Sequence, residues 1–441
     1  MTAVKPHTYA GDFEWPEIEL PARPYGFDNM NFGGHTIDVP RMRENRVRHA
    51  REVMERNGVD AVLAINEWNN TYFTGVVVPY WTTPSSGLRY ALYPGTLEAP
   101  ILYEQGDIGY HAKNTCPWLH KVKVAITGSG WIGRTMGPNY FRVQTDKMVR
   151  QIVGDLKDAG FNLKRDVLAI DTYDPALIAA FEEAKVKVNP EGQRIMIEAR
   201  KNKNQDEVEC MRVTCAISDA MFEELRSNLR PGVRESELVG LMHKKCYDLG
   251  GRIYSGVFVA SGPAAWPNPR DETDRVIQPG DIVYADTYNS RFMGYTTCYY
   301  RTFSCGKASQ KAKDDYATAL EWVYDAINII KPGVTTKEIA EQWPPGPEIW
   351  KDIYVFYEDQ TAGNNWGHGI GLTLYETPII WREASLHDPV VIEEGMTFAV
   401  ETQHGTPGMH GVRIEEVIHV TKTGFEILTK WPVQEIMEVP Y

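Results

Sequence analysis

The segment YADTYNSRFMGYTTCYYRTF, residues 284–303, has the pattern of a hairpin that could carry acidic side chains to one site. Residues typical of strands flank a turn at Gly294, and alternate residues of a strand point to the same face. A metal-binding hairpin would have carboxylates at such alternate positions. Asp286 is present, whereas Tyr288 and Cys298 stand where other acids are expected. The hairpin therefore indicates a site with an altered set of reactive groups.

Three later segments carry further candidates for acid–base chemistry or metal binding. In NNWGHGIGLTLYETP, His368 lies between two glycines, so a ligand can approach its ring. Glu401 ends the apolar run of GMTFAVETQHG. In HGVRIEEVIHVT, the alternation puts Arg413 and Glu415 on one face of a strand and Glu416 on the other. Histidine and carboxylate are suited to proton transfer and to binding divalent metals.

The composition is that of a globular protein. A length of 441 residues indicates two or three domains. The net charge of -13, with scattered Lys and Arg, argues against nucleic acid or an anionic membrane as a partner. The first twenty residues lack the apolar stretch of a signal peptide, and no long apolar run spans a membrane. Six cysteines without a CxxC spacing give no disulfide framework or zinc ribbon, so we expect a cytoplasmic protein.

The first half of the chain predicts an arm followed by an α/β domain. Residues 1–38, rich in Pro, Gly and aromatics, are expected to form the arm, and residues 39–195 the domain. A helix is predicted at 39–57, ended by Gly58, and another at 175–184. Predicted strands share short apolar runs: 60–65, 89–94, 99–104 and 166–171.

Residues 196–441 predict a second domain with an internal repeat. Two long helices, 205–228 and 311–330, run into the similar segments LRPGVRESELVGLM and IKPGVTTKEIAEQW. In both, Pro-Gly ends the first helix and a Glu lies in the first turn of the next. A β-rich segment follows each copy, so we favour a duplicated helix–helix–strand unit over two unrelated corners. Two such units would pair their sheets around a pseudo-two-fold axis, with a cleft between them.

The order of these motifs resembles the pita-bread family, also known as the creatinase and aminopeptidase P superfamily. An acid-bearing hairpin is followed by Gly-His-Gly-Ile-Gly, a Glu at a strand end and Arg-x-Glu. The family includes methionine and Xaa-Pro aminopeptidases, prolidases, creatinase and a dimethylsulfoniopropionate lyase. The resemblance, from about residue 40 to the end, implies an α+β fold. It further implies a pita-bread catalytic domain with a pseudo-two-fold repeat behind an α/β N-terminal domain, usually in a homodimer.

Metal-dependent relatives bind two ions with two Asp, one His and two Glu. The resemblance places the His at His368 and the two Glu at Glu401 and Glu415. It places the second Asp at Cys298 and the first at Thr287, beside Asp286. Peptidase members also carry two further histidines. Here Trp266 and Pro267 stand at the position of the first, and Tyr375 stands at the position of the second.

Converging buried carboxylates need a positive partner. One option is a single divalent ion, zinc, iron or manganese, held by Cys298, His368, Glu401 and Glu415. The other is a site without metal, in which Arg301 or Arg413 and a cationic substrate supply the charge. We favour the second, because creatinase works without metal on a guanidinium compound and its GYYTA resembles GYTTC here.

The aromatic residues near the missing ligands would suit a small organic cation, through cation–π contact. The expected substrate-binding residues are Tyr288, Trp266, Tyr300, Trp366, Tyr375 and Arg413. We therefore expect a creatinase-like hydrolase that cleaves a C–N bond in a small cationic or amidine-like metabolite. His368 would be the general acid–base group, with Glu401, Glu415 and Asp286 as further catalytic residues. The alternatives are a C–S lyase that forms acrylate and dimethyl sulfide, and a non-catalytic binding protein.

Overall fold

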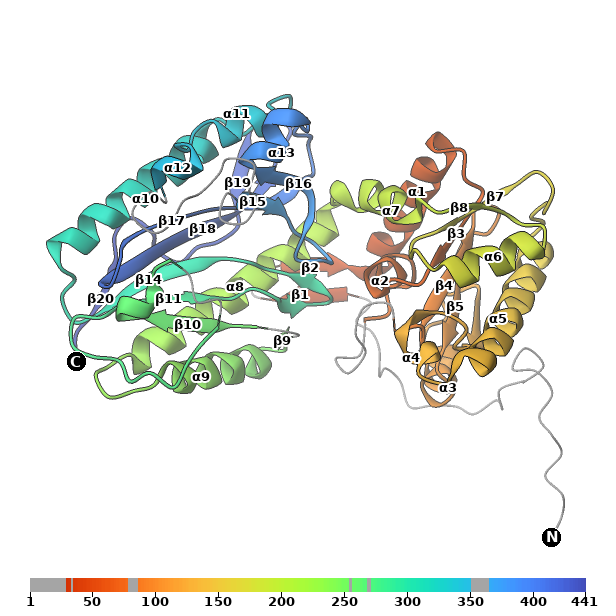
Figure 1. The fold of residues 1–441 in the computed structure, drawn as a ribbon, viewed down its shortest axis with the longest axis horizontal. Helices are drawn as coiled ribbons and strands as arrows, with labels where there is room; N and C mark the ends of the chain where they lie inside the picture. The colour runs from red at the N-terminus through yellow and green to blue at the C-terminus, as the bar shows by residue number, and fades with distance from the viewer. Residues whose placement is uncertain (1–28, 33–34, 78–85, 254–255, 268–270, 350–364) are drawn as a thin grey trace, which may run out of the picture. The chain divides into compact units, whose positions relative to one another are not determined.

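The computed structural model describes residues 29–32, 35–77, 86–253, 256–267, 271–349 and 365–441 (Figure 1). Most of the predicted N-terminal arm lies outside them; β1 (Asn29–Phe32) and β2 (His35–Asp38) form a two-stranded sheet. The chain divides into two compact units, one mainly Thr36–Arg200 and the other mainly Lys201–Tyr441. The division between the units follows Arg200 rather than the expected residue 195. Helix α7 (Gly192–Lys201) runs across residue 195 and ends at the division.

The N-terminal unit is built on one mixed sheet with the strand order β6-β5-β4-β3-β7-β8. Its strands are β3 (Ala61–Ala64), β4 (Tyr90–Pro94), β5 (Ile101–Glu104), β6 (Lys121–Val124), β7 (Val167–Ile170) and β8 (Lys187–Asn189). Its helices, besides α7, are α1 (Val39–Arg56), α2 (Glu67–Thr74), α3 (Gly106–Thr115), α4 (Gly130–Arg134), α5 (Pro138–Asp158) and α6 (Pro175–Glu183). The predicted strands and helices of this unit are confirmed within a few residues.

The first helix shows why these residues begin and end where they do. The Asp38 carboxylate caps α1 by accepting from the backbone N–H of Arg41 at 3.0 Å. Gly58 follows the helix with φ +63°, which only glycine adopts without strain.

The C-terminal unit contains a four-stranded sheet, β10-β11-β14-β20, and a five-stranded sheet, β16-β15-β17-β18-β19. A small third sheet has the order β13-β12-β9. The strands are β9 (Arg252–Ile253), β10 (Phe258–Ser261), β11 (Ile282–Asp286), β12 (Ser290–Phe292), β13 (Tyr295–Thr296), β14 (Tyr300–Cys305), β15 (Asn365–Gly369), β16 (Glu376–Trp381), β17 (Thr397–Thr406), β18 (His410–Val420), β19 (Phe425–Ile427) and β20 (Met437–Val439).

The helices of this unit are α8 (Gln205–Asn228), α9 (Glu235–Asp248), α10 (Gln310–Asn328), α11 (Thr336–Ala340), α12 (Gly346–Ile349) and α13 (Arg382–His387). Helix α8 packs against α9, and α10 packs across β17 and β18 (Figure 1). Apolar residues of α10 and of one face of β17 and β18 form a hydrophobic core of the unit. The opposite face of these strands is therefore available for a site.

The two copies of the Pro-Gly-Val motif adopt the same local structure. Gly232 and Gly333 have φ +93° and +96°, and their N–H groups donate to Ile277 and Ile392. In each copy a glutamate completes a capping box with a backbone N–H at 2.8 Å. Identical hydrogen bonds at both copies support the expected duplication. The described part of the chain contains no helix long and apolar enough to cross a membrane.

Candidate functional site

The repeat brings two acids to equivalent positions in two strands. Asp286 ends β11, nine residues after Ile277, and Glu401 lies in β17, nine residues after Ile392. Asp286 is 2% exposed, and its carboxylate accepts from the backbone N–H of Tyr288 at 2.9 Å. Burial raises the pKa of Asp286 to about 7, although a hydrogen bond from a tyrosine opposes the shift.

Glu401 is paired with Arg413, its neighbour on the adjacent strand β18. The Arg413 Nη2 donates to Glu401 Oε2 at 2.9 Å, and both side chains are buried. The guanidinium also lies 3.9 Å from the ring centre of Tyr300 and 5.9 Å from that of Tyr284. Arg413 therefore supplies a fixed positive charge to this side of the site.

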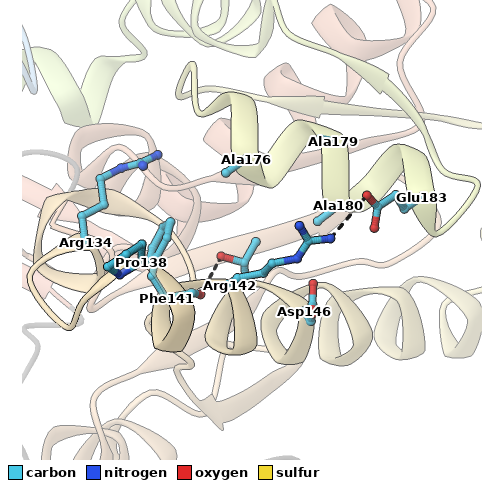
Figure 2. A pocket seen from close by; sticks show the side chains of 10 residues that line it. Arg134, Pro138, Phe141, Arg142, Asp146, Ala176, Ala179, Ala180 and Glu183 are labelled. Carbon is cyan, nitrogen blue, oxygen red and sulfur yellow. Dashed lines mark hydrogen bonds and ion pairs between the residues drawn. The ribbon is translucent and has the colours of Figure 1, made fainter.

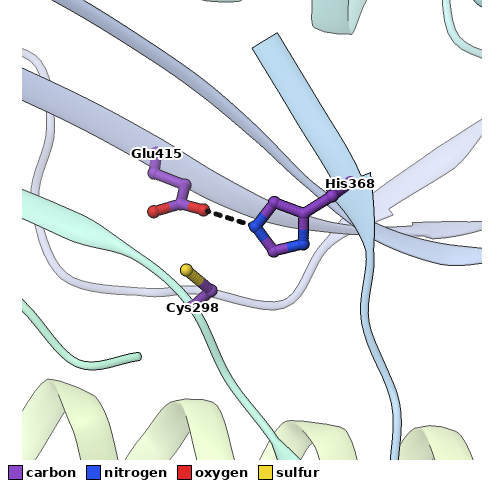
Figure 3. Close-up of side chains that lie close together, drawn as sticks. All are labelled: Cys298, His368 and Glu415. Carbon is purple, nitrogen blue, oxygen red and sulfur yellow. Dashed lines mark ion pairs between the residues drawn. The ribbon is translucent and has the colours of Figure 1, made fainter. Parts of the chain in front are cut away.

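Three further side chains point toward one another from separate strands and a loop, as Figure 3 shows. Cys298 comes from the segment between β13 and β14, His368 from β15 and Glu415 from β18. One ligand atom of each lies within 4.8 Å of those of the other two. His368 Nε2 is 3.9 Å from Glu415 Oε1, and all three side chains are buried.

The surroundings of this cluster are short of positive charge. Neither carboxylate oxygen of Glu415 has an N–H or O–H donor among the described residues. Burial, and then the carboxylates of Glu401 and Asp286, raise the pKa of Glu415. Burial, and then Glu415, raise the pKa of the Cys298 thiol. Burial lowers the pKa of His368, so its imidazole is neutral near pH 7.

The next residue of β18, Glu416, faces away from the site. Its carboxylate accepts from Arg301 Nη2 at 2.7 Å and from Tyr324 Oη at 2.9 Å. The predicted alternation of this strand is confirmed. Arg301 is committed to the opposite face, so of the two arginines considered from the sequence, Arg413 is the one beside the site acids.

The predicted aromatic residues have different positions. Tyr375 stacks on the His368 ring with a centroid separation of 4.2 Å and is 47% exposed. Tyr288 lies edge-on to Phe258. Trp266 stacks near His404 at the end of the β17–β18 hairpin.

Trp366 is buried in the hydrophobic core and stacks on Trp343 at 5.3 Å. Packing therefore explains this tryptophan, in place of the expected substrate contact. Sequence reasoning missed Tyr284, which lies beside Arg413. Tyr284 precedes Asp286 by two residues in β11, so strand alternation could have placed both on one face.

The two-ion site of metal-dependent relatives does not fit these residues. At the position of the first Asp, Thr287 is buried, and its hydroxyl donates to the Tyr299 carbonyl at 3.4 Å. At the position of the second stands Cys298. Glu401, the fourth ligand expected for a single ion, is outside the cluster of Figure 3. The convergent donors among the described residues are one thiol, one imidazole and one carboxylate.

A separate cavity of about 360 Å³ lies in the N-terminal unit, between α5 and α6 (Figure 2). Three of its charged residues have partners: Arg142 lies 3.8 Å from Glu183, and Arg134 pairs with Asp174 at 2.7 Å. Nothing in this arrangement points to a ligand.

Comparison with known proteins supports the expected fold. Residues 209–422 match the family model described as metallopeptidase family M24. An Xaa-Pro dipeptidase of Pyrococcus horikoshii is 27% identical over 251 residues, 56% of this chain and 68% of that protein. An uncharacterized peptidase of Bacillus subtilis is 26% identical over 395 residues, 89% of this chain and 99% of that protein.

Solved structures are similar over most of the chain. An Xaa-Pro dipeptidase from Bacillus anthracis aligns with a TM-score of 0.67 and 25% identity, covering 89% of this chain and 99% of that one. An X-Pro aminopeptidase from Thermotoga maritima, 21% identical, aligns with a TM-score of 0.68 over 89% of this chain and 99% of that one. The α+β fold, with a pita-bread domain behind an N-terminal domain, is confirmed.

Proposed function

We propose that this protein, whose C-terminal unit has the pita-bread fold of metallopeptidase family M24, is a hydrolase that cleaves a C–N bond in a small, positively charged substrate. The observation that carries the proposal is the excess of buried acid. When ionised, Asp286, Glu401 and Glu415 carry three negative charges, and Arg413, which pairs with Glu401, offsets one, so two negative charges remain. Buried charges without partners are costly, so a cation from outside the chain stabilises this site.

We infer that the bond cleaved is a C–N bond because the names of the relatives describe cleavage of peptide bonds. The positive charge of the substrate follows from the acids and from the rings beside them. Tyr375 offers an exposed ring over His368, and aromatic faces attract organic cations. A guanidinium, amidinium or ammonium group would satisfy both features.

In this proposal Asp286 exchanges a proton with the substrate or with water. Its pKa of about 7 lies near neutral pH, where a general acid–base group is most effective. The backbone N–H of Tyr288 fixes its carboxylate. His368, the acid–base group expected from the sequence, turns Nε2 toward Glu415 and Cys298.

A second candidate function is hydrolysis of Xaa-Pro dipeptides, because several relatives are named Xaa-Pro dipeptidases. The α-ammonium group of a dipeptide would also meet the acids of the site. Against it stand Thr287 and Cys298 at the positions of two metal-binding acids, and Tyr375 at that of a histidine.

The test is a substrate panel assayed with the purified full-length protein in water labelled with oxygen-18. The panel contains guanidino, amidino and ammonium compounds with a cleavable C–N bond, Xaa-Pro dipeptides, and dimethylsulfoniopropionate. We expect label in one product from a cationic non-peptide compound. Glu401→Gln should lower this turnover, while Glu394→Gln, a change at an exposed acid, should not. A kcat/KM highest for a dipeptide, or release of dimethyl sulfide without label, would overturn the proposal.

A further inference from the structure

We infer that Cys298, His368 and Glu415 bind one divalent ion of borderline softness, such as zinc, through a thiolate, an imidazole nitrogen and a carboxylate. Metal-dependent relatives bind two ions through carboxylates and a histidine, whereas this site would bind one ion and includes a thiolate. It also reverses our preference from the sequence for a site without metal. The inference concerns ion binding and holds whatever substrate the enzyme uses.

The first support is the convergence of the three donors. Their ligand atoms lie within 4.8 Å of one another, and His368 Nε2 lies 3.9 Å from Glu415 Oε1. Zinc–sulfur bonds of about 2.3 Å and zinc–nitrogen bonds of about 2.0–2.1 Å place neighbouring ligand atoms roughly 3.3–3.7 Å apart in a tetrahedron. Small side-chain rotations therefore close the cluster of Figure 3 around an ion.

The second support is the orientation of the imidazole. His368 Nδ1 lies 3.2 Å from the carbonyl oxygen of Gly369, which suits an Nδ1–H donor. That tautomer leaves the lone pair of Nε2 directed at Glu415 and Cys298. Metal-binding histidines commonly donate their other N–H to a carbonyl or carboxylate in this way.

The third support is that Glu415 lacks donors. Both of its oxygens are buried and have no N–H or O–H partner among the described residues. Native proteins rarely leave such groups unsatisfied. An ion would neutralise the carboxylate together with a Cys298 thiolate, and one negative charge would remain near Asp286, Glu401 and Arg413 for the substrate.

The site has room for one ion because the ligands of a second are missing or engaged. Thr287 donates its hydroxyl to a backbone carbonyl, and Glu401 is held by Arg413. Three protein ligands with one thiolate favour zinc or iron over magnesium or calcium, and leave one coordination position open. Open positions are typical of catalytic rather than structural zinc sites.

The competing role for Cys298 is that of a nucleophile without metal. Carboxylates surround its thiol, and a thiolate nucleophile needs positive neighbours. Burial and the carboxylates of Glu415, Asp286 and Glu401 all raise the pKa of the thiol, so these surroundings favour the ligand role.

The test measures ion binding directly, without substrate. The full-length protein is stripped with a chelator, reloaded with zinc or cobalt(II), and analysed for metal content and for absorption from thiolate-to-cobalt charge transfer. Cys298→Ser removes the thiolate, and Cys116→Ser is the matched control, a buried cysteine of the N-terminal unit beside a threonine hydroxyl.

We expect about one ion per chain, and the charge-transfer band, in the native protein and in Cys116→Ser. Cys298→Ser should lack the band and bind zinc at least about 10-fold more weakly. Two ions per chain, no retained ion, or unchanged affinity in Cys298→Ser would overturn the inference. Should Cys298→Ser fail to fold, zinc must slow alkylation of Cys298 in the native protein, and equal rates with and without zinc would also overturn it.

Discussion

Asp286 and Glu401 hold equivalent places in the two halves of the C-terminal unit, yet they face different partners. Each lies nine residues after the isoleucine that bonds a Pro-Gly-Val turn. In the strand register, Tyr300 stands opposite Asp286, whereas Glu415 stands opposite Glu401. The duplication therefore explains why the two acids converge. Because a tyrosine stands opposite Asp286 and a second acid stands opposite Glu401, more carboxylates gather on the Glu401 side of the site.

Arg413 is expected to be essential for the stability of the C-terminal unit. Arg413→Met would leave Glu401 buried without its partner, a change that costs about 3–5 kcal/mol. Adding Glu401→Gln should restore part of the loss, as measured by denaturant unfolding. Arg226→Met breaks an exposed pair with Glu223 and should cost at most about 1 kcal/mol. Equal effects of the two arginine changes would contradict this account.

Tyr375 is expected to act on substrate binding rather than on folding. Its ring stacks on His368 and is 47% exposed, so Tyr375→Ala removes a contact surface without opening the core. The KM should rise about 10-fold, equivalent to 1.4 kcal/mol, with a smaller change in kcat. Tyr375→Phe should behave like the native protein. Tyr173→Ala, at a tyrosine 79% exposed in the N-terminal unit, serves as the control.

The stability of the N-terminal unit should depend on the ionisation of Asp171. Burial raises its pKa from 3.8 to about 6, although Asn69 and two backbone N–H groups donate to it. Because the folded pKa is the higher one, its stabilising contribution is complete below about pH 4 and is lost as the pH rises through 6. The loss amounts to about 3 kcal/mol.

Unfolding of Asp171→Asn across pH 4–7 checks this prediction. The variant should lose less stability than the native protein over that range. Asp166→Asn is the control of opposite sign, because a hydrogen bond from Arg165 lowers the pKa of Asp166. Asp166→Asn should therefore lower the free energy of unfolding more at pH 7 than at pH 4. Parallel curves for the native protein and Asp171→Asn would refute the assignment.

The repeated glycine turns should be sensitive to a single methyl group. Gly232 has φ +93°, so Gly232→Ala is expected to destabilise the unit by about 1–2 kcal/mol, although no atom lies close to the added carbon. Gly333→Ala should cost a similar amount, since its φ is +96°. Gly240, in the exposed interior of α9, also has free space, and Gly240→Ala should stabilise by about 0.5–1 kcal/mol. Thermal or denaturant unfolding distinguishes the two signs.

The sequence by itself determined the elements and their repeat, because these depend on local patterns. The helix that begins at Val39 has its cap and its terminal glycine within a few residues. The Pro-Gly-Val copies predicted matching turns, which the hydrogen bonds of Gly232 and Gly333 reproduce. Alternation in β18 correctly separated Glu415 from Glu416, since side chains of a strand alternate between faces.

The family resemblance grouped Cys298, His368, Glu401 and Glu415, but the tertiary structure decided which charges pair, because pairing depends on residues far apart in the chain. Arg413 pairs with Glu401, Arg301 turns to Glu416, and Trp366 packs on Trp343 in the core. Cys298, His368 and Glu415 lie in three separate segments, so no local pattern could show that one ligand atom of each falls within 4.8 Å of the others. Burial, which makes the unpaired acid costly and an ion or cation favourable, arises only when the strands pack together.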